Sequence, residues 1–381
     1  MNQGLKKERS HRQVNLACQG LITRNNNAFE LARHFIPKGD LLLWRLERYD
    51  RFRGEASLLE GSQKGGSYQE VGKFLIYVIP FLKAFGATEQ RVAEYSTVSL
   101  SLMPGAEKFL QMLQAAYIPC FIVSSAFRPF IRSLCRLLGF EESLTYSTPL
   151  DIDEVAIDIS EQEVLKDIAD EILNMPFLSW RNDSAAPQCR QVFPKEHISY
   201  WQRLESILND EIANMQIGKL LSRGLALAGK GKVAAIKDSL EKTGNPAEGV
   251  IYFGSSILDA AALSWVRAAG GLAVSFNGDR AALQSAEVAV MSGNSAILAI
   301  LSDIFYHQGK EAVLDLINTW DLQHIQIQTE KLKIHPSLIS ELFSHEPESF
   351  PLLDLITDEN LERLVEASQS CRRMTLGEVW E

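Results

Sequence analysis

Four polar residues stand where the sequence predicts a ligand site. Ser255 and Ser256 follow the short apolar run 249–254, Asn277 follows a second such run, 270–276, and Asp259 opens the segment between the runs. That segment, 259–269, is rich in alanine and has apolar residues at helical spacing, which predicts a strand, a crossover helix and a parallel strand. Ligands of open α/β sheets bind beyond the carboxyl ends of parallel strands. We therefore expect these four side chains to converge on one site.

The same residues resemble a motif of a known superfamily. The run Gly254-Ser-Ser-Ile-Leu-Asp259 is similar to the fourth motif of the haloacid dehalogenase (HAD) phosphohydrolases, usually Gly-Asp-Ser-x-x-Asp, in which both carboxylates support Mg²⁺. Ser255 stands where the first of these acids is expected. The run 17–31 resembles an archaeal-type branch of uncharacterised predicted phosphohydrolases, Asp-x-Glu-Gly-Pro followed by Asn-Asp-Asn-Ala-(Tyr/Phe)-Glu-Leu. In that comparison Ala17 replaces the nucleophile and Gln19 replaces the general acid/base.

Two further stretches follow the order of the family motifs. Residues 118–123 predict a core strand that ends at Ser124-Ser125, and this resembles the second motif, whose hydroxyl binds the phosphoryl group. The helix expected over 229–244 opens with Lys232, or less favourably Lys230, at the place of the third-motif lysine, which neutralises phosphate and aspartate charge. Glycines at this helix N-terminus also let backbone N–H groups approach an anion. The resemblance thus implies that Ser124, Ser125, Lys232 and Asp259 bind the ligand, and Asn277 is added to these ligand-binding residues because it follows the second strand.

The missing acids remove most of the chemistry of the family. Residues i and i+2 of a strand face the same way, so positions 17 and 19 share a site, but Ala17 and Gln19 supply neither an anionic nucleophile nor a proton-transfer group. Cys18 faces the opposite side, toward the core, and does not replace the nucleophile. Mg²⁺ prefers charged oxygen ligands, and Asp259 is the one motif acid that remains. Because loss of a nucleophile costs on the order of 10⁶ in turnover, we predict no catalytic residue, no metal site and no cofactor.

Composition excludes several classes of protein. The chain carries 38 basic and 48 acidic residues, a net charge of -10, without a basic stripe interleaved with aromatics, so we do not expect a nucleic-acid partner. Its longest uncharged apolar run, 74–82, is far shorter than the ~20 residues of a membrane span. The five cysteines form no Cys-x-x-Cys pair, which is typical of reduced thiols. We expect a cytoplasmic protein without a membrane partner.

The chain of 381 residues is long enough for about two or three domains. We expect an α/β fold with a HAD-like, Rossmann-like parallel sheet, helical cap insertions and a helical C-terminal extension. The expected parts are a disordered tail 1–13, a core formed by 14–40, 102–150 and 226–320, a helical cap insertion 41–101, a second and mainly helical insertion 151–225, and the extension 321–381.

We interpret the sequence as a catalytically degenerate HAD-like protein, a pseudophosphatase that binds a phosphorylated small molecule or regulates a partner and retains part of a phosphate pocket. Two alternatives stay open. One is an active, Mg²⁺-dependent phosphohydrolase with relocated acids, for which Asp151 and Asp153 are the nearest candidates. The other is a protein–protein interaction module that binds a partner through the insertions or the C-terminal helices. An open pocket favours a ligand, whereas a closed pocket with an exposed apolar patch favours the module.

Overall fold

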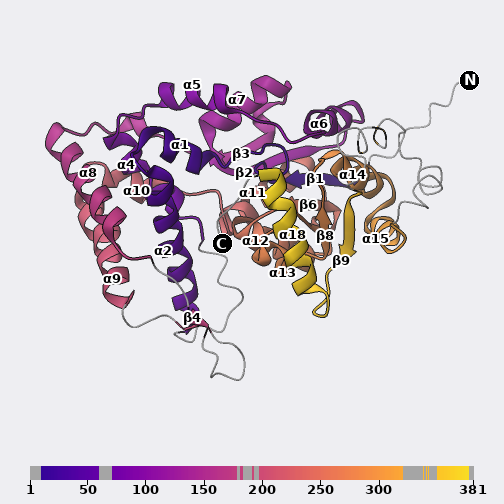
Figure 1. Ribbon diagram of the computed structural model, residues 1–381. Coiled ribbons are helices and arrows are strands. Elements are labelled where there is room, and N and C mark those ends of the chain that lie inside the picture. Colours follow the sequence, from indigo (N-terminus) through magenta and orange to yellow (C-terminus); the bar gives the residue numbers. More distant parts are fainter. Residues whose placement is uncertain are drawn as a thin grey trace, which may run out of the picture.

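The protein consists of an α/β core and a helical body beside it (Figure 1). The computed structural model describes residues 10–59, 71–177, 181–182, 191–192, 197–320, 338, 340, 342 and 350–376. Most of the expected tail, 1–9, lies outside the described residues, as do parts of both insertions and most of the segment 321–349. Within the described ranges, no helix has the length and apolarity needed to cross a membrane.

The core is a seven-stranded sheet in the order β3-β2-β1-β6-β7-β8-β9. Its strands are β1 (Gln13–Leu16), β2 (Cys120–Phe127), β3 (Thr145–Thr148), β6 (Val250–Gly254), β7 (Leu272–Phe276), β8 (Val288–Met291) and β9 (Leu352–Leu355). The first six are parallel, which confirms the predicted fold class, and β9 runs antiparallel to β8. From β1 the chain adds β2 and β3 on one side of the sheet, and it then adds β6, β7, β8 and β9 on the other side. This reversal between β1 and β6 is the point where open α/β sheets bind ligands.

Alternating residues of the central strands enter separate apolar clusters on the two faces of the sheet. Ile251 and Phe253 pack in one cluster, with helices α6 (Ala106–Ala115), α7 (Arg128–Leu138), α14 (Ala296–Gln308) and α15 (Lys310–Asn318). Val250 and Tyr252 pack in another, with α11 (Lys230–Thr243) and α12 (Ala260–Ala268). Every residue of β1, β2, β6, β7 and β8 is buried, as expected for parallel strands covered on both faces.

The helices of the two insertions share one apolar cluster. It joins α2 (Gly39–Leu59), α3 (Phe74–Tyr77), α4 (Ile79–Ala84) and α10 (Gly218–Arg223) to α8 (Ile159–Asn174) and α9 (Ile198–Ser206). Leu46 of the first insertion and Leu165 and Leu208 of the second are all fully or almost fully buried there. Helix α1 (Asn27–Phe35) connects β1 to this body, which we call the cap. Helix α5 (Glu89–Ser99) contacts both parts: it packs on α7 of the core, and its Val92 belongs to the apolar cluster of the cap.

Three local expectations differ from the structure. The C-terminal extension includes a strand, because β9 hydrogen-bonds to the free edge of β8 before α18 (Leu361–Leu376) begins. Strand β2 does not end at Ser124 but continues to Phe127, with a register irregularity against β3. In the second insertion, which was expected to be mainly helical, α9 does not continue as a regular α-helix but passes into a π-helical segment, Ile207–Glu211, and a short 3₁₀ turn, Ile212–Asn214.

Candidate functional site

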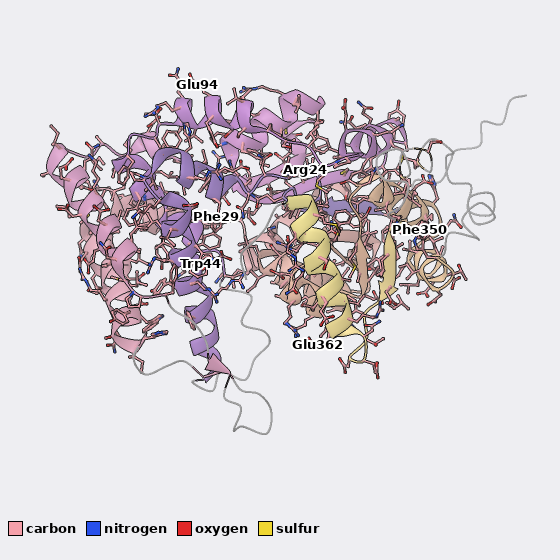
Figure 2. All side chains as sticks on the ribbon, viewed as in Figure 1. Arg24, Phe29, Trp44, Glu94, Phe350 and Glu362 are labelled. Carbon is pink, nitrogen blue, oxygen red and sulfur yellow. The ribbon has the colours of Figure 1, made fainter. Side chains whose placement is uncertain are left out.

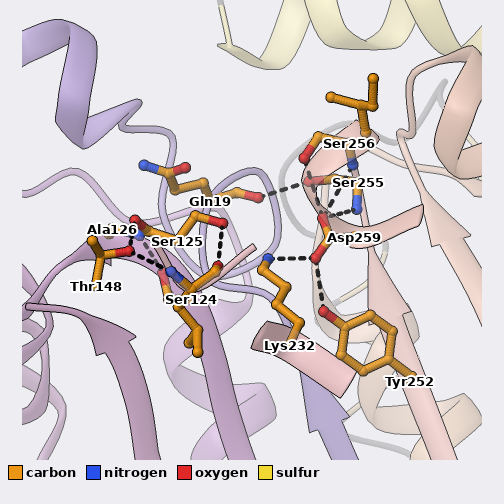
Figure 3. A network of polar contacts seen from close by, with 12 residues as sticks. Gln19, Ser124, Ser125, Ala126, Thr148, Lys232, Tyr252, Ser255, Ser256 and Asp259 are labelled. Carbon is orange, nitrogen blue, oxygen red and sulfur yellow. Dashed lines mark hydrogen bonds and ion pairs between the residues drawn. The ribbon is translucent and has the colours of Figure 1, made fainter. Parts of the chain in front are cut away.

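Lys232 and Asp259 form a buried ion pair at the carboxyl end of the sheet (Figure 3). Lys232 lies in the first turn of α11 and Asp259 in the turn that follows β6, and their exposed side-chain fractions are 2% and 1%. The Lys232 Nζ atom is 2.5 Å from Asp259 Oδ1, and the Tyr252 hydroxyl donates to the same oxygen at 2.7 Å. The third-motif lysine and the last fourth-motif acid are therefore in direct contact.

The second oxygen of Asp259 is occupied as well. Its Oδ2 atom accepts hydrogen bonds from the backbone N–H groups of Ser255 and Ser256, at 3.0 and 3.1 Å, and from the Ser256 hydroxyl at 3.3 Å. Burial alone raises the pKa of Asp259, but the charge of Lys232 and the hydrogen bonds outweigh it, so the pKa lies below its ordinary value. Burial and the neighbouring Asp259 charge raise the pKa of Tyr252 well above its ordinary value. The carboxylate is thus charged, shielded from water and fully hydrogen-bonded.

The end of β1 carries no acid near this pair. The Ala17 N–H group extends the β1–β6 ladder by donating to the Phe253 carbonyl at 2.8 Å. The Gln19 carbonyl accepts from the Ser255 hydroxyl at 3.0 Å, which joins the first-motif and fourth-motif loops. Cys18 is fully buried in the core, where burial raises the pKa of its thiol to about 12. That position agrees with the period-two argument and leaves no nucleophile at this point of the chain.

The hydroxyls expected to bind phosphate are used inside the protein. Ser124 Oγ accepts from the Ala126 N–H group at 3.1 Å, and Ser125 Oγ donates to the Leu227 carbonyl at 3.1 Å. Thr148 Oγ1 donates to the Ser125 carbonyl and accepts from the Leu227 N–H group (Figure 3). Both serines are at most 5% exposed. The Ser124 bond lies within β2, whereas Ser125 connects β2 to β3 and to the loop before α11.

Asn277 has a structural position rather than the expected one in a pocket. Its backbone φ of 45° is in the left-handed region, which asparagine tolerates better than most residues. Its Nδ2 atom donates to the Ser292 carbonyl at 2.7 Å, and its Oδ1 atom accepts from the Ser292 N–H group at 3.0 Å. Both ends of the amide therefore connect the loops after β7 and β8, and no ligand contact is left for the side chain.

An open cleft of about 420 Å³ lies on the cap side of this network. Of the predicted site residues, Gln19, Ser255 and Ser256 line it, whereas Ser124, Ser125, Lys232, Asp259 and Asn277 do not. Asp151 and Asp153 also lie elsewhere, where they pair with Arg128 and Lys83. The cleft is lined by Gln19, Gly20, Arg24, Asn25, Asn26, Phe29, Glu30, Arg33, Asp40, Trp44, Glu47, Arg48, Arg51, Phe74, Leu75, Ser255, Ser256, Ile257, Leu258, Asp279, Arg372 and Leu376.

Many charged and aromatic residues of the cleft come from one face of α1 and one face of α2. On α1 the residues are 29, 30 and 33, just after the N-cap residue 26, and on α2 they are 40, 44, 47, 48 and 51, both at helical spacing. Reasoning from the sequence overlooked them, since a polar stripe on a helix usually faces solvent. The sequence pattern that could have identified them is the clustering of arginines with Phe29 and Trp44 on these helix faces.

Helix α18 closes the core side of the cleft. The Arg372 guanidinium donates to the carbonyl oxygens of Ser255 and Asn277 at 2.8 and 2.9 Å. Leu376 lies against Gly20, because a Cβ atom added to that glycine would be 3.6 Å from the leucine Cδ1 atom. The C-terminal extension thus holds the fourth-motif loop and covers the place where the first motif ends.

The residues at the motif positions do not fit Mg²⁺. Hard oxygen ligands, preferably charged, are required, and Asp259 already shares its oxygens among five donors. Positions 17, 19 and 255 add no carboxylate. Across the described part of the chain, no group of three or more His, Cys, Asp or Glu side chains is arranged to hold a metal ion.

No protein-family model matches the sequence, and no curated protein matches it either. Among solved structures, the gene product AF1437 from Archaeoglobus fulgidus superposes with a TM-score of 0.73 at 19% identity, over 96% of this chain and 97% of that one. In the structure the side chain of Lys232 contacts Asp259, Asp259 accepts from the Ser255 N–H group, and the Ser255 hydroxyl donates to the Gln19 carbonyl, so positions 19, 232, 255 and 259 meet at one point. The fold is HAD-like.

Two other similar structures have lower scores. A phosphoserine phosphatase, solved as a phospho-aspartyl intermediate analogue, has a TM-score of 0.41 at 10% identity, over 74% of this chain and 93% of that one. A HAD family hydrolase from Salmonella enterica serovar Typhi has a TM-score of 0.35 at 11% identity, over 71% of this chain and 64% of that one.

Proposed function

We propose that this protein is a pseudophosphatase, a HAD-like protein that binds an anionic small molecule in the cleft without hydrolysing it. The observation that carries the proposal is the state of Asp259. This last motif acid is buried, charged and hydrogen-bonded by five donors, so it has no free lone pair for a metal ion or a substrate.

The other groups that the HAD reaction requires are also missing from this chain. Phosphoryl transfer in this superfamily needs an aspartate nucleophile and a second acid two residues later, and these positions hold Ala17 and Gln19. Cys18 between them is buried, with a pKa of about 12, so it is a protonated thiol near neutral pH. With the nucleophile and the proton-transfer group replaced, and with Asp259 as the one remaining motif acid, the residual turnover should be too low to measure.

The open cleft favours a ligand-binding role over a module that only contacts other proteins. Its volume of about 420 Å³ lies within the range of roughly 300–1,000 Å³ that is usual for small-molecule sites. Arginines contribute to its walls although the whole chain has a net charge of -10. A phosphorylated metabolite is a suitable class of ligand, because arginine forms bidentate hydrogen bonds with phosphate.

One observation supports a second candidate, an active hydrolase that uses a new acid. Glu30 lines the cleft, and burial raises its pKa, although hydrogen bonds from Asn25 and the charge of Arg33 oppose the shift. A cleft carboxyl group with a raised pKa is a candidate general acid. We rank this function second because Glu30 has no nucleophile or metal ligand set beside it among the described residues.

Turnover of 1-naphthyl phosphate with and without Mg²⁺ tests the proposal. We expect release of 1-naphthol to equal the rate without protein. Metal-dependent release that Asp259→Asn abolishes would show that the family mechanism survives. Release that Glu30→Gln abolishes, but that the matched variant Glu94→Gln on α5 leaves intact, would establish the second candidate; Glu94 lies on the outer side of the molecule, away from the cleft (Figure 2).

A further inference from the structure

We infer that the cleft binds an organic anion that carries a flat aromatic ring, with the anionic group at Arg24 and the ring against Phe29 and Trp44. This inference rests on the proposed function and adds the chemical class of the ligand and the residues that recognise it. It also places the anion away from Ser124 and Lys232, whose polar atoms are engaged within the protein.

Arg24 provides a cation that the protein itself does not neutralise. It follows the first-motif loop and lines the cleft, and its side chain is exposed. Within the ranges that the structure describes, its guanidinium group makes no hydrogen bond and no ion pair. Arg51 of the same cleft differs, because it pairs with Glu47 at 3.0 Å. An unpaired guanidinium beside a cavity suits a carboxylate or a phosphate, which it can bind through two parallel hydrogen bonds.

Glu30, the acid nearest to Arg24 in the chain, is bonded to another side chain. Its two carboxylate oxygens accept hydrogen bonds from Asn25 Nδ2, at 2.8 and 2.9 Å. Arg33 lies one helical turn after Glu30 and also lines the cleft. The end of the cleft formed by the first-motif loop and α1 therefore attracts anions.

Aromatic side chains form the neighbouring wall. The Trp44 ring is held by the Arg48 guanidinium, 4.8 Å from one ring centroid, and by Phe177, edge-on at 4.6 Å between centroids. Phe29 is half-buried on α1 and packs against the apolar cluster of the cap. Figure 2 shows Arg24, Phe29 and Trp44 one after another along the boundary between the cap and α18. A planar ring gains contact area and favourable aromatic geometry against such a wall, whereas an aliphatic anion lacks the aromatic geometry.

The test is a calorimetric titration of the full chain with four probes. The probe 1-naphthyl phosphate carries both the ring and the anion, 1-naphthol carries only the ring, and inorganic phosphate carries only the anion. The fourth probe, 1-naphthoate, distinguishes a carboxylate from a phosphate as the anionic group. We expect 1-naphthyl phosphate to bind at least about tenfold more tightly than 1-naphthol or inorganic phosphate, because each of these lacks one of the two interactions.

Variants then assign the interactions to residues. Arg24→Gln should weaken 1-naphthyl phosphate about tenfold or more and leave 1-naphthol unchanged. Trp44→Leu should weaken both ring-bearing probes, and Trp44→Phe should restore most of the affinity; if Trp44→Leu fails to fold, Phe29→Leu tests the same wall. The matched control is Arg132→Gln, because Arg132 is an exposed arginine on α7 that pairs with Glu142 and lies outside the cleft.

Three results would overturn the inference: no binding of 1-naphthyl phosphate, equal affinity for inorganic phosphate, or affinity that Arg24→Gln and Arg132→Gln change alike. Tight binding of 1-naphthoate with weak binding of 1-naphthyl phosphate would keep the ring and the arginine but assign a carboxylate ligand. Hydrolysis of bound 1-naphthyl phosphate would refute the proposed loss of activity and would leave the assignment of the ligand class standing. The two proposals therefore fail in separate ways.

Discussion

Replacing Asp259 by asparagine tests whether the Lys232–Asp259 pair is a structural element. The asparagine has nearly the same shape, so packing is preserved, but the Lys232 ammonium group would remain buried without a counter-charge. Removing one member of a buried ion pair costs about 3–5 kcal/mol. We expect a loss of that size in the free energy of unfolding, measured by chemical denaturation followed by circular dichroism.

A second substitution, at Lys232, makes the test decisive. The double variant Lys232→Met/Asp259→Asn removes the stranded cation, so it should be more stable than Asp259→Asn alone and recover about half of the loss or more. The matched control is Asp238→Asn, which breaks the exposed Lys242–Asp238 pair, with side chains 47% and 50% exposed. Exposed pairs contribute about 0–1 kcal/mol. The reasoning fails if Asp259→Asn costs no more than this control, or if the double variant is less stable than the single one.

The Lys232–Asp259 pair also predicts how the stability lost in the Asp259→Asn variant depends on pH. The pKa of Asp259 in the folded protein lies below its ordinary value of 3.8, so the folded state binds this proton more weakly than the unfolded state does. Its stabilising contribution is therefore present above pH 3.8 and declines as the pH falls through the folded-state pKa. The stability difference between the natural protein and Asp259→Asn should be largest near neutral pH and shrink in acid. A difference that grows as the pH falls would contradict the lowered pKa.

Three further predictions concern the loops around this pair. The triple change Ala17→Asp, Gln19→Glu and Ser255→Asp should create Mg²⁺ binding in calorimetry, because it places carboxylates at the motif positions; a folded variant without any gain would mean that these positions do not share one site. Arg372→Ala should lower the free energy of unfolding by about 1–3 kcal/mol, since two charge-assisted hydrogen bonds to carbonyl oxygens are lost, and a change no larger than that of the exposed neighbour variant Arg373→Ala would argue against it. Iodoacetamide at pH 8 should modify Cys18 only after unfolding, because the buried thiol has a pKa of about 12, and rapid labelling of the native protein in a peptide map would show that this thiol is accessible.

Local patterns in the sequence predicted most of the core. Apolar runs of strand length predicted β6 and β7, and the spacer between them predicted α12, because a buried parallel strand and an amphipathic helix each have a characteristic pattern. The antiparallel strand β9 was not predicted. It is a four-residue segment, and its pairing with β8 depends on residues about sixty positions away in the chain. Such an edge strand is selected by the free hydrogen-bonding groups of its neighbour rather than by its own pattern.

The candidate site also has features that the sequence predicted and features that only the structure shows. The residue types alone determined that acids are absent at positions 17, 19 and 255, because a missing carboxylate needs no coordinates to be recognised. Residue types could not show that Lys232 and Asp259 neutralise each other, that Ser124 and Ser125 are buried and hydrogen-bonded within the protein, or that a cleft with several arginines opens beside them. Burial and hydrogen-bond saturation depend on contacts between distant segments, such as the 117 positions that separate Arg372 from Ser255. The sequence therefore determined which chemistry is missing, and only the tertiary structure decided which polar groups remain open to a ligand.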